Sequence, residues 1–232
     1  MSRKPVEEST RPVHASFAVV LQVRDGRLQT LLWQRAREPF AGDWALPGGS
    51  LSPGETLEQS ILRHLEEKVD VREVAHVEQL GTLSDPGRNP ARWELATAYL
   101  GLVPLGLDPD VPEDTGWHPV DALPRTAFDH GDVVLAGRDR LRGKLSYTNV
   151  GFALAPEVFT LAELRDIYVA ALGHDVSATN LKRVLIRRRV LEPTGLRRGS
   201  GRAGGRPAET FRFRQRSLEI TDPFAALRPP GR

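Results

Sequence analysis

Residues 49–71, GSLSPGETLEQSILRHLEEKVDV, contain the residue types and spacing with the clearest chemical meaning in the chain. A glycine-rich loop leads into a predicted helix over 56–69 that carries several carboxylates. Backbone groups of such a loop can contact phosphates, and converging carboxylates are the ligands that divalent cations use in pyrophosphate chemistry. The segment therefore predicts a site for a ligand that contains a pyrophosphate group.

The spacing of this segment resembles the Nudix box, a glycine followed at fixed intervals by a glutamate and by a helix with an arginine and three glutamates. The matching positions are Gly49, Glu55, Arg63, Leu65, Glu67 and Val71. The string LPGG at the start of the loop and two predicted strands ahead of it agree with the same family. The resemblance implies the Nudix α/β/α sandwich with a mixed sheet, in which the helix glutamates hold metal ions.

Three positions depart from the Nudix pattern: His64 and Lys68 replace glutamates, and Asp70 replaces a glycine. A protonated lysine has no lone pair for a metal. At about 4 Å and an effective dielectric of about 20, it repels a divalent cation by roughly 8 kcal/mol. We therefore expect a retained pocket with weakened or lost hydrolysis. No catalytic residue is assigned and no cofactor is required, with bound Mg²⁺ as the alternative.

Two side chains of this helix have alternative interpretations. Lys68 could contact a phosphate directly and replace the charge of a metal, or it could point into solvent. Glu67 is the one metal-binding glutamate that survives, but it could instead be an exposed partner of Arg63 at i,i+4 spacing. The sequence leaves both alternatives open.

Strand and helix patterns surround this segment. The runs 15–23 and 28–36 are joined by Asp25-Gly26, which predicts a β-hairpin. The other predicted elements of this region are strands over 71–83 and 93–103 and a helix over about 130–145, with Asp129 as its N-cap. Strands interleaved with two helices indicate a layered α+β domain.

Charge divides the chain into two parts. Residues 1–174 hold 18 basic and 25 acidic residues, a net charge of −7. Residues 175–216 hold 12 basic and 3 acidic residues, a net charge of +9. Opposite signs indicate two domains with different partners. Such a basic excess repels itself unless it meets a polyanion, which favours nucleic acid as the partner of the second part.

The second part has the element order of a winged helix-turn-helix. Thr160 to Glu163 form a capping-box pattern before a predicted helix that ends near Gly173. A second predicted helix over 180–189 is capped by Ser177 or Thr179. A strand, a Gly/Arg loop and another strand follow.

The second of these helices has the two faces of a DNA-recognition helix. Its apolar residues fall on one side, and Lys182, Arg183 and Arg187 fall on another, where they can enter a major groove. The alternatives are a solvated basic face, an RNA partner or a membrane surface. The predicted DNA-binding residues are Lys182, Arg183, Arg187, Arg188, Arg197, Arg198, Arg202 and Arg206.

A Nudix-like domain followed by a winged helix resembles the Nudix-related transcriptional regulators of NAD metabolism, the NrtR family. Several local strings are similar to that family: HVEQLGT, DPGRNP, FDHGDVVLAG, RLRGKLSYTNVGFAL, FTLAEL and GRPAETFRF. The resemblance implies that the first domain binds ADP-ribose or a related nucleotide. It also implies that the winged helix binds double-stranded operator DNA as a homodimer and that the protein acts as a repressor.

The resemblance also assigns ligand-binding positions, and the phosphate contact considered for Lys68 adds one more. Together they are Gly48, Gly49, Glu55, Arg63, Glu67, Lys68 and Arg88. Of these, Arg88 lies in a loop that faces the Nudix box in the family fold, which suggests a phosphate ligand. Its alternative role is that of a simple turn residue.

The expected domain boundaries follow from these patterns. They are a flexible N-terminus over 1–14, an effector-binding domain over 15–155, a winged helix over 156–216 and a poorly ordered tail over 217–232. The linker around 146–156 is the expected coupling element. The absence of cysteine excludes disulfide scaffolds and thiol catalysis. No apolar run reaches the length of a membrane span and no secretory signal is visible, so the expected compartment is the cytoplasm.

Two rival functions compete with a nucleotide-sensing regulator. One is a Nudix hydrolase that cleaves ADP-ribose or a related nucleoside diphosphate derivative and whose basic region aids only solubility or localisation. The other is an architectural DNA-binding protein without an effector. Turnover of ADP-ribose would favour the first, and DNA affinity that ignores every nucleotide would favour the second.

Overall fold

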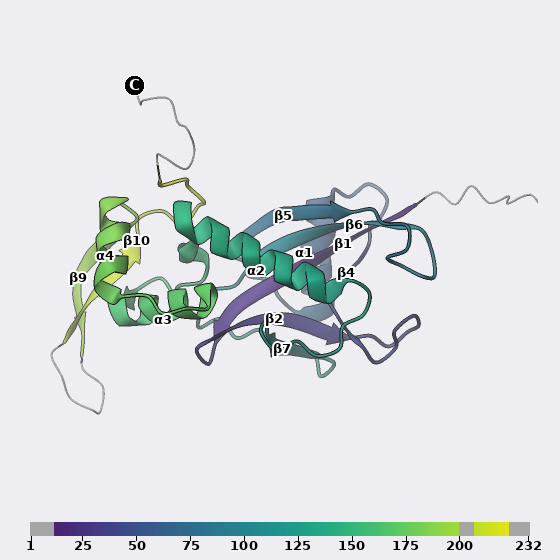
Figure 1. The fold of residues 1–232 in the computed structure, drawn as a ribbon, viewed down its shortest axis with the longest axis horizontal. Coiled ribbons are helices and arrows are strands. Elements are labelled where there is room, and N and C mark those ends of the chain that lie inside the picture. Colours follow the sequence, from purple (N-terminus) through teal and green to yellow (C-terminus); the bar gives the residue numbers. More distant parts are fainter. Residues whose placement is uncertain (1–11, 200–206, 223–232) are drawn as a thin grey trace, which may run out of the picture.

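The structure, a computed structural model, describes residues 12–199 and 207–222 (Figure 1). Its first part contains β1 (Val13–Arg24), β2 (Arg27–Gln34), β3 (Trp44–Ala45), β4 (Gly48–Ser50), α1 (Leu57–Val69), β5 (His76–Leu83), β6 (Glu94–Leu102), β7 (Thr115–Pro119) and α2 (His130–Tyr147). The second part contains the short 3₁₀ helix η1 (Val150–Ala153), β8 (Phe159–Thr160), α3 (Leu161–Leu172), α4 (Ala178–Arg187), β9 (Leu191–Arg198) and β10 (Ala208–Phe213). The predicted elements are confirmed, although the strand expected to begin at residue 71 begins at His76.

The first two strands form the predicted hairpin. β1 and β2 pair in antiparallel register from Leu21 with Thr30 to Arg24 with Arg27. Asp25 and Gly26 form the turn with φ values of 50° and 72°. Asp and Gly tolerate this left-handed backbone, which matches the twist of the two strands.

A seven-stranded mixed sheet forms the centre of the first part. Its strand order is β3-β2-β1-β6-β5, with β4 also paired to β1 and β7 also paired to β2. β1 and β6 run parallel, whereas the other pairs are antiparallel. This is the mixed sheet expected from the Nudix resemblance.

Helices cover both faces of this sheet. Because successive strand residues point to opposite faces, Ala18 and Val20 pack with α1, whereas Val19 and Leu21 belong to the core that includes α2. In Figure 1, α2 crosses the near face and leads towards the C-terminal helices. The long axis of α2 therefore connects one end of the sheet with the second part of the chain.

The second part has the predicted winged-helix topology. β8, β10 and β9 form a small antiparallel sheet beside α3 and α4. Thr160 and Glu163 form the expected capping box of α3, and Ser177 caps α4. Leu181 and Leu185 are buried, so the apolar face of α4 fixes this helix on its domain.

The hydrophobic core continues across the predicted domain boundary. Phe152 and Phe159 belong to the same buried cluster as the α2 face of the large sheet. Arg142 Nε on α2 donates to Ala171 O on α3 at 3.2 Å. The two parts of the chain therefore pack against each other through a shared core.

The segment that follows β10 is more regular than expected. Asn149 accepts a hydrogen bond from Glu219 N at 2.7 Å and donates one to Ser217 O at 2.9 Å. Thr221 N donates to Tyr147 O, so the expected poor order is wrong for residues 217–222. A single amide side chain with both a donor and an acceptor holds this segment, and local composition does not reveal such a partner.

Two residues that were predicted to lie in a flexible N-terminus belong to a strand. Val13 and His14 are part of β1 and pair with Glu94 and Leu95 of β6, so the prediction over 1–14 is wrong for these two residues, and residues 1–11 lie outside the described ranges. Their parallel register with a distant strand explains why a local pattern misses them.

None of the helices in the described ranges combines the length and apolarity that crossing a bilayer requires.

Candidate functional site

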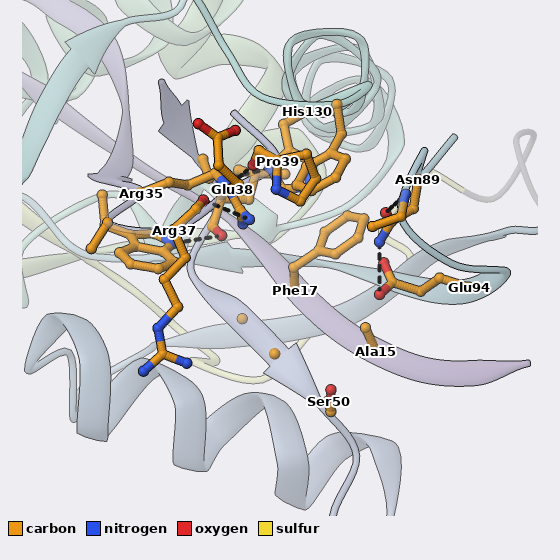
Figure 2. A pocket seen from close by; sticks show the side chains of 18 of the residues that line it. Ala15, Phe17, Arg35, Arg37, Glu38, Pro39, Ser50, Asn89, Glu94 and His130 are labelled. Atoms are coloured by element: carbon orange, nitrogen blue, oxygen red, sulfur yellow. Dashed lines mark hydrogen bonds between the residues drawn. The ribbon is translucent and has the colours of Figure 1, made fainter. Parts of the chain in front are cut away.

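A cavity of about 550 Å³ opens beside β1 and β4. Its other walls are the 35–39 loop, the 89–94 loop and the residues at the start of α2. Figure 2 places the Phe17 ring between the 35–39 loop and the pair formed by Asn89 and Glu94. Three segments that are far apart in the sequence thus surround one concave space.

Aromatic side chains provide the apolar surface of this cavity. Phe17, Trp33 and Phe128 all line it. Phe128 has a φ of 52°, a left-handed conformation that is uncommon for a bulky residue and is typical of sites with a special structural role. Flat apolar surfaces of this kind suit the base or the sugar of a nucleotide.

Cations form part of the polar surface of the cavity. Arg35 Nε donates to Pro39 O at 3.0 Å, and its guanidinium carbon lies 4.8 Å from the centroid of the Phe128 ring. Arg35, Arg37 and Lys68 line the cavity, and none has a carboxylate within ion-pair distance in the part of the chain that the structure describes. Unneutralised cations around a cavity favour an anionic ligand.

Lys68 lies at the cavity rather than in solvent. Its Nζ donates to Gly48 O and lies 4.9 Å from the centroid of the Trp33 ring. Burial, followed by the nearby charges of Arg35 and Arg63, lowers the pKa of Lys68. The ammonium therefore faces the pocket rather than solvent, and its contact with a phosphate stays a prediction.

Glu55 and Glu67 have a different role from the one that the Nudix box implies. Arg63 binds the Glu55 carboxylate through Nε at 3.0 Å and through a terminal nitrogen at 2.6 Å. This hydrogen bond from Arg63, together with one from Ser52 N, lowers the pKa of Glu55 to about 2. The Glu67 side chain is 58 % exposed and lies 3.2 Å from Arg63, so it is an i,i+4 partner on the outer surface. Glu55, Arg63 and Glu67 do not line the cavity, whereas Gly48 and Gly49, which were predicted with them, do.

His64 replaces a metal ligand by a packing contact. Its ring is buried beside Gly49, where an added Cβ would lie 2.6 Å from the ring. His64 Nε2 lies 3.2 Å from Ser50 O, and burial lowers the pKa of the ring. At the end of the same helix, Asp70 adopts a φ of 49° where the Nudix pattern has glycine, so the left-handed turn is kept.

Arg88 is a buried arginine that forms ion pairs with two segments of the chain. Its side chain is 3 % exposed and binds Asp129 at 2.7 Å and Glu94 at 3.0 Å. It lies over the Phe17 ring but is not among the cavity-lining residues. Neither predicted role, phosphate ligand or simple turn residue, describes this arrangement. Asp129 precedes α2 as expected, but its carboxylate binds Arg88 and makes no capping hydrogen bond.

His130 is a buried neutral group at the cavity wall. Its Nδ1 accepts a hydrogen bond from Leu46 N at 3.0 Å. Burial, opposed by Asp129 and reinforced by Arg88 and Arg35, lowers the pKa of His130 to about 3. The imidazole is therefore neutral at physiological pH, and it contributes shape and a backbone contact rather than charge.

Acidification from about pH 7 to about pH 5 should destabilise the fold through His130. Its pKa is 6.5 in a free chain and about 3 in the fold, so the unfolded state binds a proton that the folded state does not. The contribution of His130 to the free energy of unfolding is complete above about pH 6.5 and is lost progressively as the pH falls towards 3. At pH 5 the free energy of unfolding is therefore lower by about 2 kcal/mol. Urea unfolding at the two pH values measures this loss. The control is His130→Asn, whose amide oxygen can still accept the hydrogen bond from Leu46 N. The variant should lose about 2 kcal/mol less than the wild type between the two pH values. An unchanged pH dependence would contradict the role of His130 in this loss.

The candidate DNA-binding surface lies on α4 and β9. Arg183, Arg187 and Arg197 are exposed and have no ion-pair partner among the described residues. Lys182 binds Glu209 at 3.3 Å, and Arg198 forms an ion pair with Glu163. Arg202 and Arg206 lie outside the described residues.

Arg188 is not part of the exposed recognition surface. Its guanidinium donates to Ser146 O and Thr148 O, both at 3.1 Å, and to Thr221 Oγ1 at 2.5 and 2.9 Å. Burial lowers the pKa of its guanidinium. The predicted DNA contact is therefore wrong for Arg188, because carbonyl groups at the end of α2 and the segment after β10 use its donors.

The chain matches two protein-family models. Residues 12–136 match the NUDIX domain, and residues 151–213 match the NrtR DNA-binding winged helix domain. The ADPR responsive transcriptional repressor NtrR of Acinetobacter baylyi is 31 % identical over 219 residues, which cover 91 % of this chain and 86 % of the relative. The chain belongs to the NrtR family.

Solved NrtR structures agree with this family assignment. Shewanella oneidensis NrtR complexed with a 27mer DNA has 33 % identity and a TM-score of 0.73, and the match covers 86 % of this chain and 93 % of that one. The NUDIX domain of the same protein complexed with ADP ribose has 32 % identity and a TM-score of 0.51, over 60 % and 94 % of the two chains. The two-part architecture is therefore that of NrtR proteins.

Nudix proteins generally use divalent metal ions, but the side chains present here do not fit a Nudix-type metal site. Glu66 lies 3.8 Å from Arg72, whereas Glu55 and Glu67 bind Arg63. Lys68 occupies a position where an anionic ligand is needed. No group of three or more His, Asp or Glu residues that could hold a metal occurs among the described residues.

Sequence patterns missed much of the cavity wall. Phe17, Arg35, Arg37, Phe128 and His130 line it, and none was predicted as a site residue. The closely spaced arginines of the 35–39 loop were the available signal, because they follow a strand directly and have few acidic neighbours. Only the fold brings this loop to the residues that precede and begin α2.

Proposed function

We propose that this NrtR-family chain is an ADP-ribose-responsive transcriptional repressor. Residues 15–155 form the effector domain, and residues 156–216 form the DNA-binding domain. The carrying observation is a cavity with aromatic walls and three cations that form no ion pair within the described residues, in the same chain as an exposed arginine surface on a winged helix. ADP-ribose combines a planar base, two sugars and a diphosphate, and it matches this mixed lining.

The helix α2 is the proposed mechanical link between the two sites. Phe128 and His130, at its beginning, line the cavity. At its end, the carbonyl groups of Ser146 and Thr148 bind Arg188, which directly follows α4. An effector can shift the arrangement of the two parts only if it binds one arrangement better than another. A ligand that displaces the start of α2 has a direct path to the recognition helix.

Hydrolysis is weak or absent in the proposed function. The metal-binding positions of the Nudix box hold His64 and Lys68, and the remaining Glu67 binds Arg63. A sensor that destroyed its effector would erase its own signal. The rival function, a Nudix hydrolase for ADP-ribose, requires a metal arrangement other than the one that the Nudix box provides.

A homodimer completes the proposal. In a dimer with a two-fold axis, the two recognition helices lie about one DNA turn, or a multiple of it, apart. The operator is then expected to be roughly palindromic. Sedimentation equilibrium with and without operator DNA tests this assembly. A monomer on a single half-site would remove the dimer from the proposal.

Electrophoretic mobility shift with the DNA upstream of the gene tests the regulatory function. We expect a shift at salt below about 100 mM, because the phosphate contribution is strong there. ADP-ribose should change the operator Kd by about 5-fold or more, the range of typical allosteric coupling. The absence of any shift would contradict the proposal. Rapid metal-dependent turnover of ADP-ribose by a protein that ignores DNA would establish the rival hydrolase.

A further inference from the structure

We infer that Lys68, together with Arg35 and Arg37, binds the diphosphate of the effector directly, so that this site recognises its ligand without a divalent metal ion. The inference rests on the proposed function and names the groups that act at its effector site. It follows from the disagreement between the side chains present and a Nudix-type metal site. The positive charges of these side chains take the place of the charge that a bound metal ion would provide.

The position of Lys68 supports a direct phosphate contact. The residue lies in the last turn of α1, and its Nζ reaches Gly48 O in the loop that contains the Nudix-box glycines. The Trp33 ring lies at one side of the ammonium, 4.9 Å from Nζ. An ammonium has three N–H donors, so the bond to Gly48 leaves donors for a ligand in the cavity.

The charge of the cavity wall matches a diphosphate. Four cations line the cavity, namely Arg35, Arg37, Lys68 and Arg92, against the two carboxylates of Glu38 and Glu94. Glu94 is already neutralised, because it binds Arg92 at 2.6 Å and Arg88 at 3.0 Å. The lining therefore has a net positive charge of two, and a diphosphate diester has one negative charge on each phosphate.

The position of Arg35 explains how it could join Lys68. Its guanidinium is held by backbone carbonyls of Arg37 and Pro39 and by the Phe128 ring, rather than by a carboxylate. Carbonyl contacts leave the positive charge of the group intact. A ligand phosphate would complete the site, because charge-assisted hydrogen bonds are stronger than those between neutral groups.

Calorimetric titration of the full chain with ADP-ribose, in excess EDTA and in excess Mg²⁺, tests the inference. The wild-type Kd should agree in the two buffers within about twofold. Lys68→Gln should weaken binding by about 10- to 100-fold, the effect of losing a hydrogen bond to a charged group. Lys68→Arg keeps the charge and should recover most of the loss. Arg27→Gln, the control, removes one positive charge from an exposed position outside both sites and should bind ADP-ribose as the wild type does.

The possible outcomes separate this inference from the proposed function. If the wild type fails to bind ADP-ribose in both buffers, the proposed function fails. If it binds only with Mg²⁺, or if Lys68→Gln binds as tightly as the wild type, the inference is overturned and the proposed function stands. Far-UV circular dichroism and the unliganded Tm of each variant identify a folding defect. If Lys68→Gln is misfolded, the Kd of Lys68→Arg is compared with that of the wild type instead.

Discussion

Replacing Arg183 and Arg187 together by alanine should weaken operator binding by about 30-fold or more. Both side chains are exposed on α4 and form no ion pair within the described residues. Each arginine contact to a base edge contributes about 1–3 kcal/mol of discrimination, and the two contributions combine. The variant should also lose most of its preference for operator over random DNA. Fluorescence anisotropy with both DNAs at several salt concentrations measures the two effects.

A charge-matched control identifies the cause of this loss. Arg72→Ala with Arg125→Ala removes the same number of charges from exposed positions of the Nudix domain. Its operator affinity should change little, because both side chains lie outside the winged helix. Equal losses in the two double variants would mean that net charge, rather than the α4 surface, determines binding.

Replacing Arg88 by methionine should reduce the free energy of unfolding by about 3 kcal/mol. The change removes the arginine that binds Asp129 and the more buried of the two arginines that bind Glu94. Removing one partner of a buried ion pair leaves charge that is less well compensated, and the effect here is at the lower end of the usual range because Arg92 remains. Glu94 is nearly as buried as Arg88, and Asp129 is partly buried beside α2. Urea unfolding followed by circular dichroism measures the difference from the wild type.

Arg92→Met is the matched control for this variant. Arg92 binds the same Glu94 at 2.6 Å, but its own side chain is 46 % exposed. Exposed ion pairs contribute about 1 kcal/mol or less, so this variant should be only slightly destabilised. A similar loss in the two variants would show that burial does not set the contribution of Arg88.

Elements that depend on local patterns could be predicted well. The turn at Asp25-Gly26 needs only two residues that accept a left-handed backbone, and it forms as expected. The capping box of Thr160 and Glu163 is likewise confirmed, because its partners lie within one helical turn. Combined with the Nudix and NrtR resemblances, these local signals were sufficient for the fold class and the order of the two domains.

Roles that depend on distant partners could not be predicted in the same way. Arg88 binds a carboxylate 41 residues away, and Arg188 binds an oxygen 33 residues away. Arg188 was expected to contact DNA, and Arg88 was expected to be either a phosphate ligand or a simple turn residue. Instead, both arginines join parts of the chain to one another. The sequence contains many acceptors for an arginine, and only packing decides which of them is close.

By itself, the sequence determined that this chain has a Nudix-like domain with an altered metal-binding helix and a basic winged helix, since residue type and spacing are local properties. The tertiary structure decided which cations remain available to a ligand. Among the described residues it left Arg35, Arg37 and Lys68 at the cavity without a carboxylate within ion-pair distance, and it paired Arg63 and Arg88 with glutamates and aspartate. The physical reason is that a charge is neutralised by its neighbours in space, and the fold alone sets those neighbours.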